Sequence, residues 1–581
     1  MVLRLPRIPA AQAIRGYHRV MAIDSSTTTS AARVAWERTV KDRYGDTDFV
    51  TINRSGVPVQ PVYDSTDLAA RGLDEAPLPG QFPFTRGIYP VHYQHQPWMD
   101  LQIIGYGMAR NLRERMDLLD REGGARGYFG GAAYNIIFDM PSSMGFDPDY
   151  PGVEGSIGDA GISVCKTEDY EVLLAGKDLT KTHFSMVCNA GSPAMFALYV
   201  AAAKRMGFEG DQLKGNITNY IYDFFGHCGG MNFSPRGSYR LAVDVGAYCA
   251  EHVPNFGTIT FSEHNICEAG ATNVQAVGLA LASVIAVLEE AQKLGLETDP
   301  IAAGMGFHVR FGEDLFEDVA KTRALRQLFA KINAERFGCT TNGALRARIH
   351  AQTAGSLATA QQPRINIIRN AYGALAAAMA GVNGMTVNAY DEALGLPTEE
   401  AVTLSLRTSQ IIAEEQGLKK VTDPLAGSYY VESLTNDVEE AVLAFIAKID
   451  EQGGLIECIE SGWARAEVAA SAFEWRREVE TGERPLIGVN RFVTDEPEEH
   501  NVFRPDPAVA RMAIDDLNRV KAQRDQAACD AALTRLREAG ENVMAGREIG
   551  SCTAALVDAA LADASLGEMQ AILFDVFGTN K

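Results

Sequence analysis

The chain has 581 residues, of which 46% are hydrophobic and 22% charged, and its formal net charge is −22 at pH 7. This length exceeds what one hydrophobic core usually supports, so we expect a large domain and at least one smaller region. The negative charge argues against a broad surface for nucleic acid or anionic membranes. The sequence also lacks an apolar run of the roughly 20 residues that span a bilayer.

The nine cysteines are scattered, mostly within apolar stretches, and no pair has the C-x-x-C spacing. Their odd number and spacing favour reduced thiols, and therefore a cytoplasmic protein, over a disulfide framework or a zinc site. Residues 1–22 contain four arginines and no acidic residue, a composition that transit peptides share. We favour an N-terminal arm for this segment, with a targeting peptide as the alternative.

The first 80 residues are polar and turn-rich, with one predicted helix at Ala31–Arg43. Beyond them, short β-branched and aromatic runs alternate with helical patterns, which is typical of strands and helices in a parallel sheet. The predicted strands are Tyr134–Asp139, Ile162–Cys165, Phe184–Cys188, Gly215–Asn219, Thr258–Ser262, Gly306–Arg310, Arg348–Thr353 and Met385–Asn388. These alternations predict a (β/α)₈ TIM barrel. The alternative, an open doubly wound sheet, would carry a glycine-rich phosphate loop after its first strand, and the sequence has none.

Strand patterns stop after Thr398, the predicted cap of the next helix. The following segments are predicted to be helical: Thr435–Gln452, Leu455–Glu480 and the alanine-rich stretches from Pro507 onward. We therefore predict an N-terminal arm and extended segment at 1–80, the barrel at 81–420 and a C-terminal helical region at 421–581.

Polar residues follow one predicted strand directly. The strand Thr258–Ser262 runs into Glu263, His264, Asn265 and Glu268. In a parallel barrel, chemistry takes place at the C-terminal ends of the strands. This stretch therefore marks the predicted active site.

Several motifs occur in a recognisable order along the chain. They are Phe84–Pro90, Phe138–Pro141, Glu268–Ala271, Asp318–Lys321, Gln352–Thr353, Asp391–Ala393 with Leu396–Thr398, Asp423–Pro424 with Gly427–Glu432, and Pro485–Asn490. In these motifs the chain resembles the large, catalytic subunit of the adenosylcobalamin-dependent acyl-CoA mutases, which include the methylmalonyl-, isobutyryl- and 2-hydroxyisobutyryl-CoA mutases. The resemblance implies a barrel that admits an acyl thioester and is capped by cobalamin at its C-terminal face.

Partners also follow from the resemblance. In this family a flavodoxin-like domain with an Asp-x-His-x-x-Gly motif ligates the cobalt, and none of the ten histidines here lies in such a motif. The resemblance therefore implies a separate small cobalamin-binding subunit in an α2β2-type heteromer. A GTPase chaperone that reloads the cofactor is a possible further partner.

The resemblance assigns site residues by matched position. For thioester contact, the family's histidine corresponds to Asn265, with His264 one place earlier, so both stay open, and Thr218 replaces a glutamine. The implied substrate-binding residues are Tyr89, Ile103, Asn135, Ile137, Ser185, Asn216, Cys228, Gln352 and Asn383. The implied cofactor-binding residues are Gly105, Met140, Ala160, Glu268, Gly355, Asn388 and Glu392.

Departures from the family bear on the substrate. Cys228 stands where the family has the arginine that pairs with the carboxylate of methylmalonyl-CoA, and a buried carboxylate without a partner is costly. Ile103 and Ile137 replace a tyrosine and an aspartate. We therefore expect a non-dicarboxylic acyl-CoA, isobutyryl-like or 2-hydroxyacyl-like.

The sequence also leaves open whether the thioester is carried by CoA or by another pantetheine carrier. Two family arginines near the CoA phosphates correspond to Gln96 and Gly304. Either other cations (Arg86, His92, His308 or Arg310) bind these phosphates, or the carrier is another pantetheine thioester.

Two alternatives remain open at this point. The first is a barrel enzyme of other chemistry, such as an aldolase or metal-dependent hydrolase. It predicts a metal or a Schiff-base lysine, and the only lysine at a predicted strand end is Lys166. We interpret His92 and His95 as a loop rather than a metal pair and predict no metal site. The second alternative is a non-catalytic family member that binds acyl-CoA.

Overall fold

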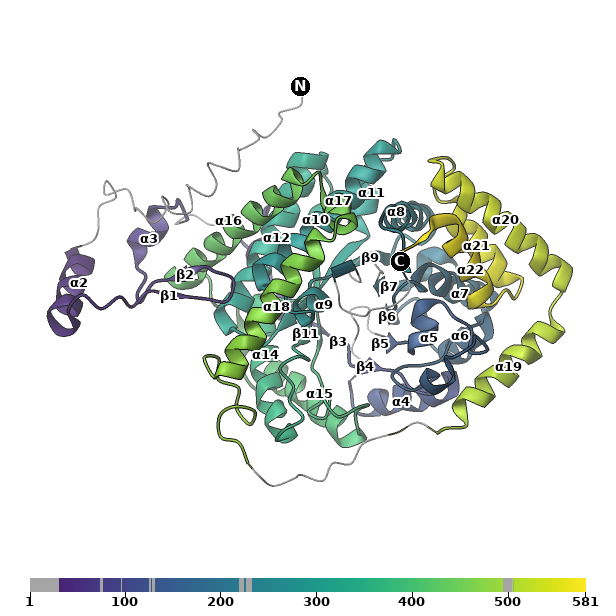
Figure 1. Ribbon diagram of the computed structural model, residues 1–581, viewed down its shortest axis with the longest axis horizontal. Coiled ribbons are helices and arrows are strands. Elements are labelled where there is room, and N and C mark those ends of the chain that lie inside the picture. The colour runs from purple at the N-terminus through teal and green to yellow at the C-terminus, as the bar shows by residue number, and fades with distance from the viewer. Residues whose placement is uncertain are drawn as a thin grey trace.

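The computed structural model describes residues 31–73, 77–95, 97–124, 127, 131–218, 224–225, 232–494, 504 and 506–580 (Figure 1). Its centre is a parallel sheet with the strand order β3-β12-β11-β10-β9-β7-β6-β5-β4. The strands are β3 (Met99–Asp100), β4 (Ile103–Ile104), β5 (Ala133–Ile137), β6 (His183–Val187), β7 (Lys214–Thr218), β9 (Phe256–Ser262), β10 (Met305–Phe311), β11 (Arg348–Thr353) and β12 (Gly384–Thr386).

The two end strands of this sheet are halves of one strand. Only Leu101 and Gln102 separate β3 from β4, and the backbone N–H of Leu101 donates to the carbonyl of Met385 over 2.9 Å. β3 pairs with β12 while β4 pairs with β5. The described strands therefore close into the predicted eight-stranded TIM barrel, whose first strand is interrupted.

One predicted strand was wrong. Ile162 and Ser163 form only isolated bridges, to Phe138 and Met108, so Ile162–Cys165 is not a barrel strand. The true first strand, Met99–Ile104, was missed because it is short and carries two buried polar residues, Asp100 and Gln102, instead of a continuous apolar run. The other predicted strands are confirmed, with ends shifted by one or two residues.

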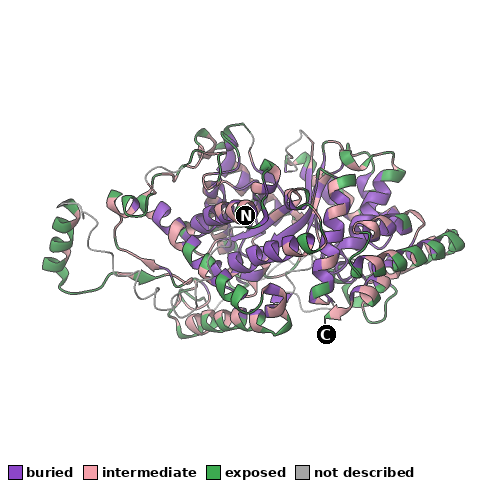
Figure 2. Cartoon of the chain, turned by 90° about the horizontal axis from the view of Figure 1, so that it is seen from above, coloured by how far each residue is buried: buried purple, intermediate pink, exposed green. Residues whose placement is uncertain are grey.

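Helices surround the sheet (Figure 1). Between the strands lie α4 (Ala109–Arg121), α5 (Met140–Met144), α6 (Thr167–Leu174), α7 (Ser192–Arg205), α8 (Pro235–His252), α9 (Glu263–Glu268), α10 (Asn273–Lys293), α11 (Thr298–Ala303), α12 (Leu315–Phe337), α13 (Asn342–Leu345), α14 (Asn366–Ala380) and α15 (Glu399–Glu414). By length and composition α10 could cross a membrane, but 83% of its apolar window is buried inside the protein. It is therefore a core helix of the barrel. Figure 2 shows that the buried residues gather at the centre of the molecule.

The C-terminal region is helical, as predicted, apart from the short end strand β13 (Thr579–Asn580), which pairs with β8 (Asn232–Phe233). Its helices are α16 (Tyr429–Glu451), α17 (Leu455–Glu460), α18 (Trp463–Thr481), α19 (Val509–Gln523), α20 (Gln526–Met544), α21 (Ser551–Leu561) and α22 (Leu566–Phe577). α16 packs on α10 and α12, whereas α21 and α22 pack on α7 and α8. Apolar residues of these helices join the hydrophobic cluster of the barrel, so the two regions share a core.

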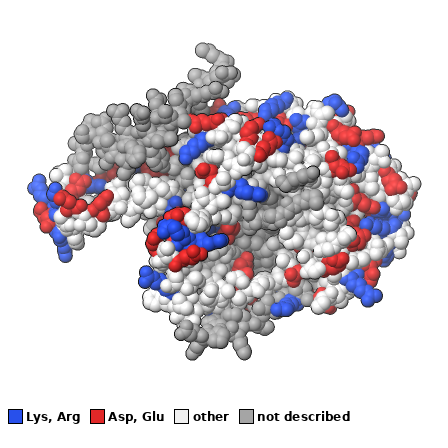
Figure 3. Space-filling model, viewed as in Figure 1, with Lys and Arg blue, Asp and Glu red and all other residues white. Residues whose placement is uncertain are grey.

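The N-terminal segment extends away from the barrel in Figure 1. The predicted helix is present as α2 (Ala31–Tyr44), followed by the β1 (Thr51–Ile52) and β2 (Pro58–Val59) hairpin and by α3 (Ser65–Ala69), which were not predicted. Residues 1–22 lie outside the described residues. His92–Gln94 forms a single 3₁₀ turn where we predicted a loop. Acidic and basic side chains are interspersed on the described face seen in Figure 3.

Candidate active site

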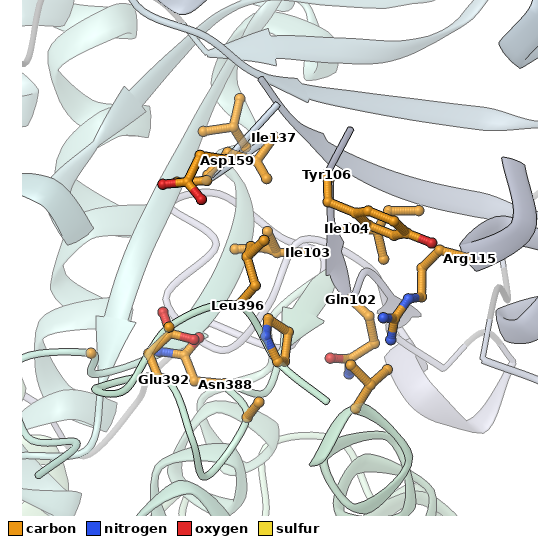
Figure 4. A pocket seen from close by; sticks show the side chains of 18 of the residues that line it. Gln102, Ile103, Ile104, Tyr106, Arg115, Ile137, Asp159, Asn388, Glu392 and Leu396 are labelled. Carbon is orange, nitrogen blue, oxygen red and sulfur yellow. The ribbon is translucent and has the colours of Figure 1, made fainter. Parts of the chain in front are cut away.

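A cavity of about 1010 Å³ lies at the C-terminal ends of the barrel strands. Residues at or after the ends of β4, β5, β9, β11 and β12 form its wall, together with residues near the start of α19, namely Arg504, Asp506, Pro507 and Ala510. In Figure 4, Asn388 and Glu392 line one side of the cavity, and Gln102, Tyr106 and Arg115 line the other. The cavity therefore occupies the position at which TIM barrels carry out chemistry.

The cavity brings many of the predicted site residues together. These are Ile103, Gly105, Ile137, Ala160, His264, Asn265, Glu268, Gln352, Gly355, Asn388 and Glu392. They come from six different strand ends and loops, far apart in the sequence. The barrel is what assembles them.

Other predicted residues lie away from the cavity wall. Asn135, Ser185 and Asn216 oppose one another on β5, β6 and β7 and form a polar rung inside the barrel. Tyr89 and Asn383 lie toward the N-terminal ends of the strands, where Asn383 Oδ1 accepts the N–H of Ile349 over 2.9 Å.

The last three predicted site residues do not line the cavity in the described part of the chain. Met140 begins α5 and is 43% exposed, outside the cavity wall. The hydroxyl of Thr218 accepts the N–H of Cys188 over 2.8 Å and so closes the end of β6 rather than facing the cavity. Cys228 lies outside the described residues.

The helix α9 follows β9 without a loop and presents His264 to the cavity. The ring of His264 stacks on that of His308, with centroids 4.5 Å apart and an interplanar angle of 11°. Burial lowers the pKa of His308 to about 4, so this imidazole is neutral at physiological pH. Asn265 is held differently, since its side-chain oxygen accepts the hydroxyl of Ser262.

A buried ion pair anchors α9. The side chains of Glu263 and Lys321 are fully buried, and Lys321 Nζ lies 2.9 Å from Glu263 Oε1. The other oxygen of Glu263 accepts the backbone N–H of Arg310 over 2.8 Å. Burial alone would lower the pKa of Lys321, but Glu263 and Asp318 raise it above its ordinary value. The residue before His264 is therefore tied to both β10 and α12.

The opposite rim contains the predicted cofactor residues. Asn388 Oδ1 accepts from Gln352 and its Nδ2 donates to the carbonyl of Thr353, both over 2.9 Å. A Cβ on Gly355 would lie 3.5 Å from Glu268 Oε2 and 3.6 Å from Asn388 Nδ2, at ordinary contact distance, so this glycine lies beside both side chains. The second oxygen of Glu268, Oε1, is buried and has no hydrogen-bond partner.

Glu392 lies beside this rim. The residue is exposed to the cavity, and desolvation by the cavity wall, together with Asp391 and Glu268, raises its pKa to about 7. At neutral pH Glu392 is therefore divided between its acid and its carboxylate. It can donate or accept a hydrogen bond.

Gly105 shows how closely the backbone packs beneath the cavity. A Cβ at this position would lie 2.2 Å from the carbonyl oxygen of Ile137. Only glycine fits between β4 and β5 at this height.

The cavity wall combines uncharged polar side chains such as Asn265 and Gln352 with ionisable ones such as Arg115. Within the described part of the chain, no lysine lines the cavity and no cluster of three or more potential ligands could hold a metal ion. Lys166 instead pairs with Asp169 and Asp516.

Sequence reasoning missed Gln102, Tyr106 and Arg115. Gln102 belongs to the interrupted first strand, which was not predicted. Arg115 lies on the buried face of α4 with Leu112, Met116 and Leu119. An arginine on the apolar face of an amphipathic helix was the signal that could have drawn attention to it.

The fold and the cavity define the class, an α/β TIM-barrel enzyme with its site at the C-terminal ends of the strands. Residues 52–579 match the family described as methylmalonyl-CoA mutase, and the chain belongs to this family. Enzymes of the family depend on adenosylcobalamin. The family expected from the sequence is therefore confirmed.

Relatives cover most of the chain. It is 36% identical to the 2-hydroxyisobutanoyl-CoA mutase large subunit of Aquincola tertiaricarbonis, over 84% of this chain and 86% of that protein. It is 35% identical to the methylmalonyl-CoA mutase of Escherichia coli, over 88% of this chain and 70% of that protein. The methylmalonyl-CoA mutase of Cereibacter sphaeroides is 34% identical, over 92% and 74% respectively.

Proposed function

We propose that this chain is the large, catalytic subunit of an adenosylcobalamin-dependent acyl-CoA mutase, an isomerase that rearranges the carbon skeleton of its substrate. Family membership supports the reaction class. The observation that carries the proposal for this chain is that His264, Asn265, Asn388 and Glu392 face one cavity above the barrel. The substrate class we propose is a non-dicarboxylic acyl thioester, isobutyryl-like or 2-hydroxyacyl-like.

The residues around the cavity fit the cofactor. Gly105 and Gly355 both line the cavity, and Glu268 offers a buried oxygen without a hydrogen-bond partner. Asn388 and Glu392 would hold the adenosyl group through its hydroxyl and amine groups. When bound, adenosylcobalamin supplies the radical that starts the rearrangement.

The chain itself holds the thioester carbonyl. An N–H donor from His264 or from the amide of Asn265 polarises the carbonyl oxygen. His264 is the better placed of the two, because its ring faces the cavity and stacks on the neutral ring of His308. Since the side-chain oxygen of Asn265 is bound to Ser262, Asn265 can act only through its NH₂ group.

The acyl chain would pack against Ile103 and Ile137, both in the cavity wall. These apolar side chains favour a hydrocarbon or small polar substituent over a charged one. In the interior of the barrel, the rung of Asn135, Ser185 and Asn216 offers hydrogen bonds to a pantetheine arm.

The carrier phosphates require cations at the N-terminal end of the barrel. Arg86 is paired with Asp423, and Arg310 with Glu313, so neither is available without breaking an ion pair. Arg346 and Arg348 form no ion pair with a carboxylate in the described part of the chain, and Arg346 lies 5.9 Å from the ring of Tyr89. We therefore assign phosphate binding to Arg346 and Arg348, for CoA or another pantetheine thioester.

A separate small cobalamin-binding subunit completes the enzyme we propose, in an α2β2-type heteromer located in the cytoplasm. A GTPase chaperone would reload the cofactor. The described cysteines are all free and buried, which supports a reducing compartment.

The test is to copurify the chain with a small cobalamin-binding protein and to record electron paramagnetic resonance spectra with added acyl-CoAs. We expect a radical signal and turnover with isobutyryl-CoA or a 2-hydroxyacyl-CoA, and none with methylmalonyl-CoA. Silence with every thioester contradicts the proposal and favours the non-catalytic alternative. Turnover that requires an added metal ion but no cobalamin favours the other barrel chemistries.

A further inference from the structure

One corner of the cavity contains two buried side chains with unpartnered donor groups. Arg115 projects from α4 and Gln102 from the break between β3 and β4, and both side chains line the cavity (Figure 4). Arg115 is 7% exposed and Gln102 is 5% exposed. Neither Arg115 Nη1 nor Gln102 Nε2 has a hydrogen-bond partner.

The guanidinium of Arg115 also lacks a counterion. It lies 5.7 Å from the ring centroid of Tyr106, a favourable cation–π arrangement. Nevertheless, no ion pair joins Arg115 to a carboxylate among the residues that the structure describes. An uncompensated buried charge destabilises a fold, so such a side chain is retained where a ligand neutralises it.

The opposite side of the cavity has the reverse character. Glu392 and the unpartnered oxygen of Glu268 face the same space from the other rim. Arg115 and Gln102 therefore do not pair with these two acids, which lie across the cavity from them (Figure 4). A planar guanidinium beside an amide N–H is suited to the oxygens of a carboxylate or a phosphate.

We propose that Arg115 and Gln102, with Tyr106 beside them, form an oxyanion-binding subsite in this cavity. The proposal deepens the function proposed above, on which it rests for the identity of the ligands. The oxyanion has two possible sources: a carboxylate at the far end of the acyl chain or the phosphodiester of the cobalamin cofactor. A carboxylate would replace the uncharged acyl chain proposed above, whereas a phosphodiester would leave that proposal unchanged.

Binding without turnover tests the subsite. Two acyl-CoA thioesters of equal chain length, one ending in a carboxylate and the other in a methyl group, are titrated against the complex of this chain with its small cobalamin-binding subunit, and adenosylcobalamin is titrated separately against the same complex. The proteins compared are wild type, Arg115→Met and Gln102→Leu. Arg121→Met is the matched control, because Arg121 is an exposed residue at the end of the same helix.

We expect Arg115→Met to weaken one oxyanion-bearing probe by about ten- to a hundredfold, the usual range for a charge-assisted hydrogen bond. Gln102→Leu should weaken the same probe less, and Arg121→Met should leave all three unchanged. A loss confined to the carboxylate thioester identifies the acyl chain as the source, and a loss confined to adenosylcobalamin identifies the cofactor.

Folding of the variant provides a second measurement. Because Arg115→Met removes an uncompensated buried charge, the ligand-free variant should melt no lower than wild type. Equal affinity of wild type and Arg115→Met for all three probes overturns the subsite. Since no radical chemistry is needed, a failed binding test leaves the mutase proposal standing, and a failed radical test leaves the binding result valid.

Discussion

At the scale of single residues, the site depends on imidazoles and amides that are kept uncharged. His264, His308 and His350 follow one another across the barrel, with ring centroids 4.5 and 5.2 Å apart. Burial lowers the pKa of both His308 and His350, so these two rings carry no positive charge at neutral pH. This row of rings is compatible with a radical reaction that needs polarisation of a carbonyl group but no proton transfer.

The role of His264 can be measured directly. Replacing His264 by Phe removes its N–H donor but keeps a flat ring against His308. If His264 holds the thioester, turnover falls by about 10²-fold, the usual cost of losing one donor to a developing oxyanion. The apparent affinity for the thioester should change much less. The matched variant Asn265→Leu should keep most of the activity, and the opposite ranking would assign the carbonyl to Asn265.

At the scale of elements, the position of the short helix α9 is fixed by contacts with β10, α12 and the end of β9. Its first residue, Glu263, receives hydrogen bonds from β10 and an ion pair from α12, while Ser262 caps it by accepting the N–H of Asn265 over 3.2 Å. These contacts come from chain segments about fifty residues away in sequence. They explain why His264 has a defined position although it lies outside a regular strand.

The ion pair beneath α9 therefore supports both stability and activity. Glu263→Gln leaves the buried ammonium of Lys321 with Asp318, 3.3 Å away, as its remaining ion-pair partner, and with a hydrogen bond to Asn273 over 2.9 Å. We expect a loss of about 3 kcal/mol in the free energy of unfolding, measured with urea. The control is Glu289→Gln, because Glu289 pairs with Arg336 at the surface and its side chain is 39% exposed. That change should stay within about 0.5 kcal/mol. An equally small loss for Glu263→Gln would show that this pair does not stabilise the fold.

At the scale of the whole molecule, buried ionisable groups affect how stability depends on pH. Burial lowers the pKa of His92, His183 and His308 to about 4, so these rings stay neutral in the folded chain while the unfolded chain takes up protons near pH 6.5. The stability that they contribute is present above pH 6.5 and is lost as the pH falls toward 4. Burial raises the pKa of Asp139 and Asp244 to about 6, and these carboxyls act in the opposite direction.

Because the histidines and the carboxyls have opposite effects on stability, the contribution of a single histidine is best measured by comparing a variant that lacks it with wild type. Relative to wild type, His308→Phe should gain stability as the pH falls from 7.5 to 4, by on the order of 3 kcal/mol if the whole shift is realised. The measurement is the difference in the free energy of unfolding between the two proteins at each pH. His252→Phe, at an exposed ring, should show no such trend. A difference for His308→Phe that is independent of pH would contradict the neutral buried ring.

The comparison of sequence and structure separates local from long-range information. The strand Thr258–Ser262 and the helix Ala31–Arg43 were predictable because their residue patterns are local and regular. The strand Met99–Ile104 was not, because its buried polar residues Asp100 and Gln102 interrupt the apolar pattern by which a buried strand is recognised. Asp100 accepts the hydroxyl of Ser409, a residue more than 300 positions later.

By itself, the sequence determined that this chain is an eight-stranded barrel of the methylmalonyl-CoA mutase family, because alternating strand and helix patterns and ordered motifs are properties of the chain read in order. Only the tertiary structure decided that His264 stacks on His308, that Lys321 supports Glu263, and that Arg115 and Gln102 share one corner of the cavity. Those relations join distant segments, and they exist only when the closed barrel brings the segments together and excludes water from between them.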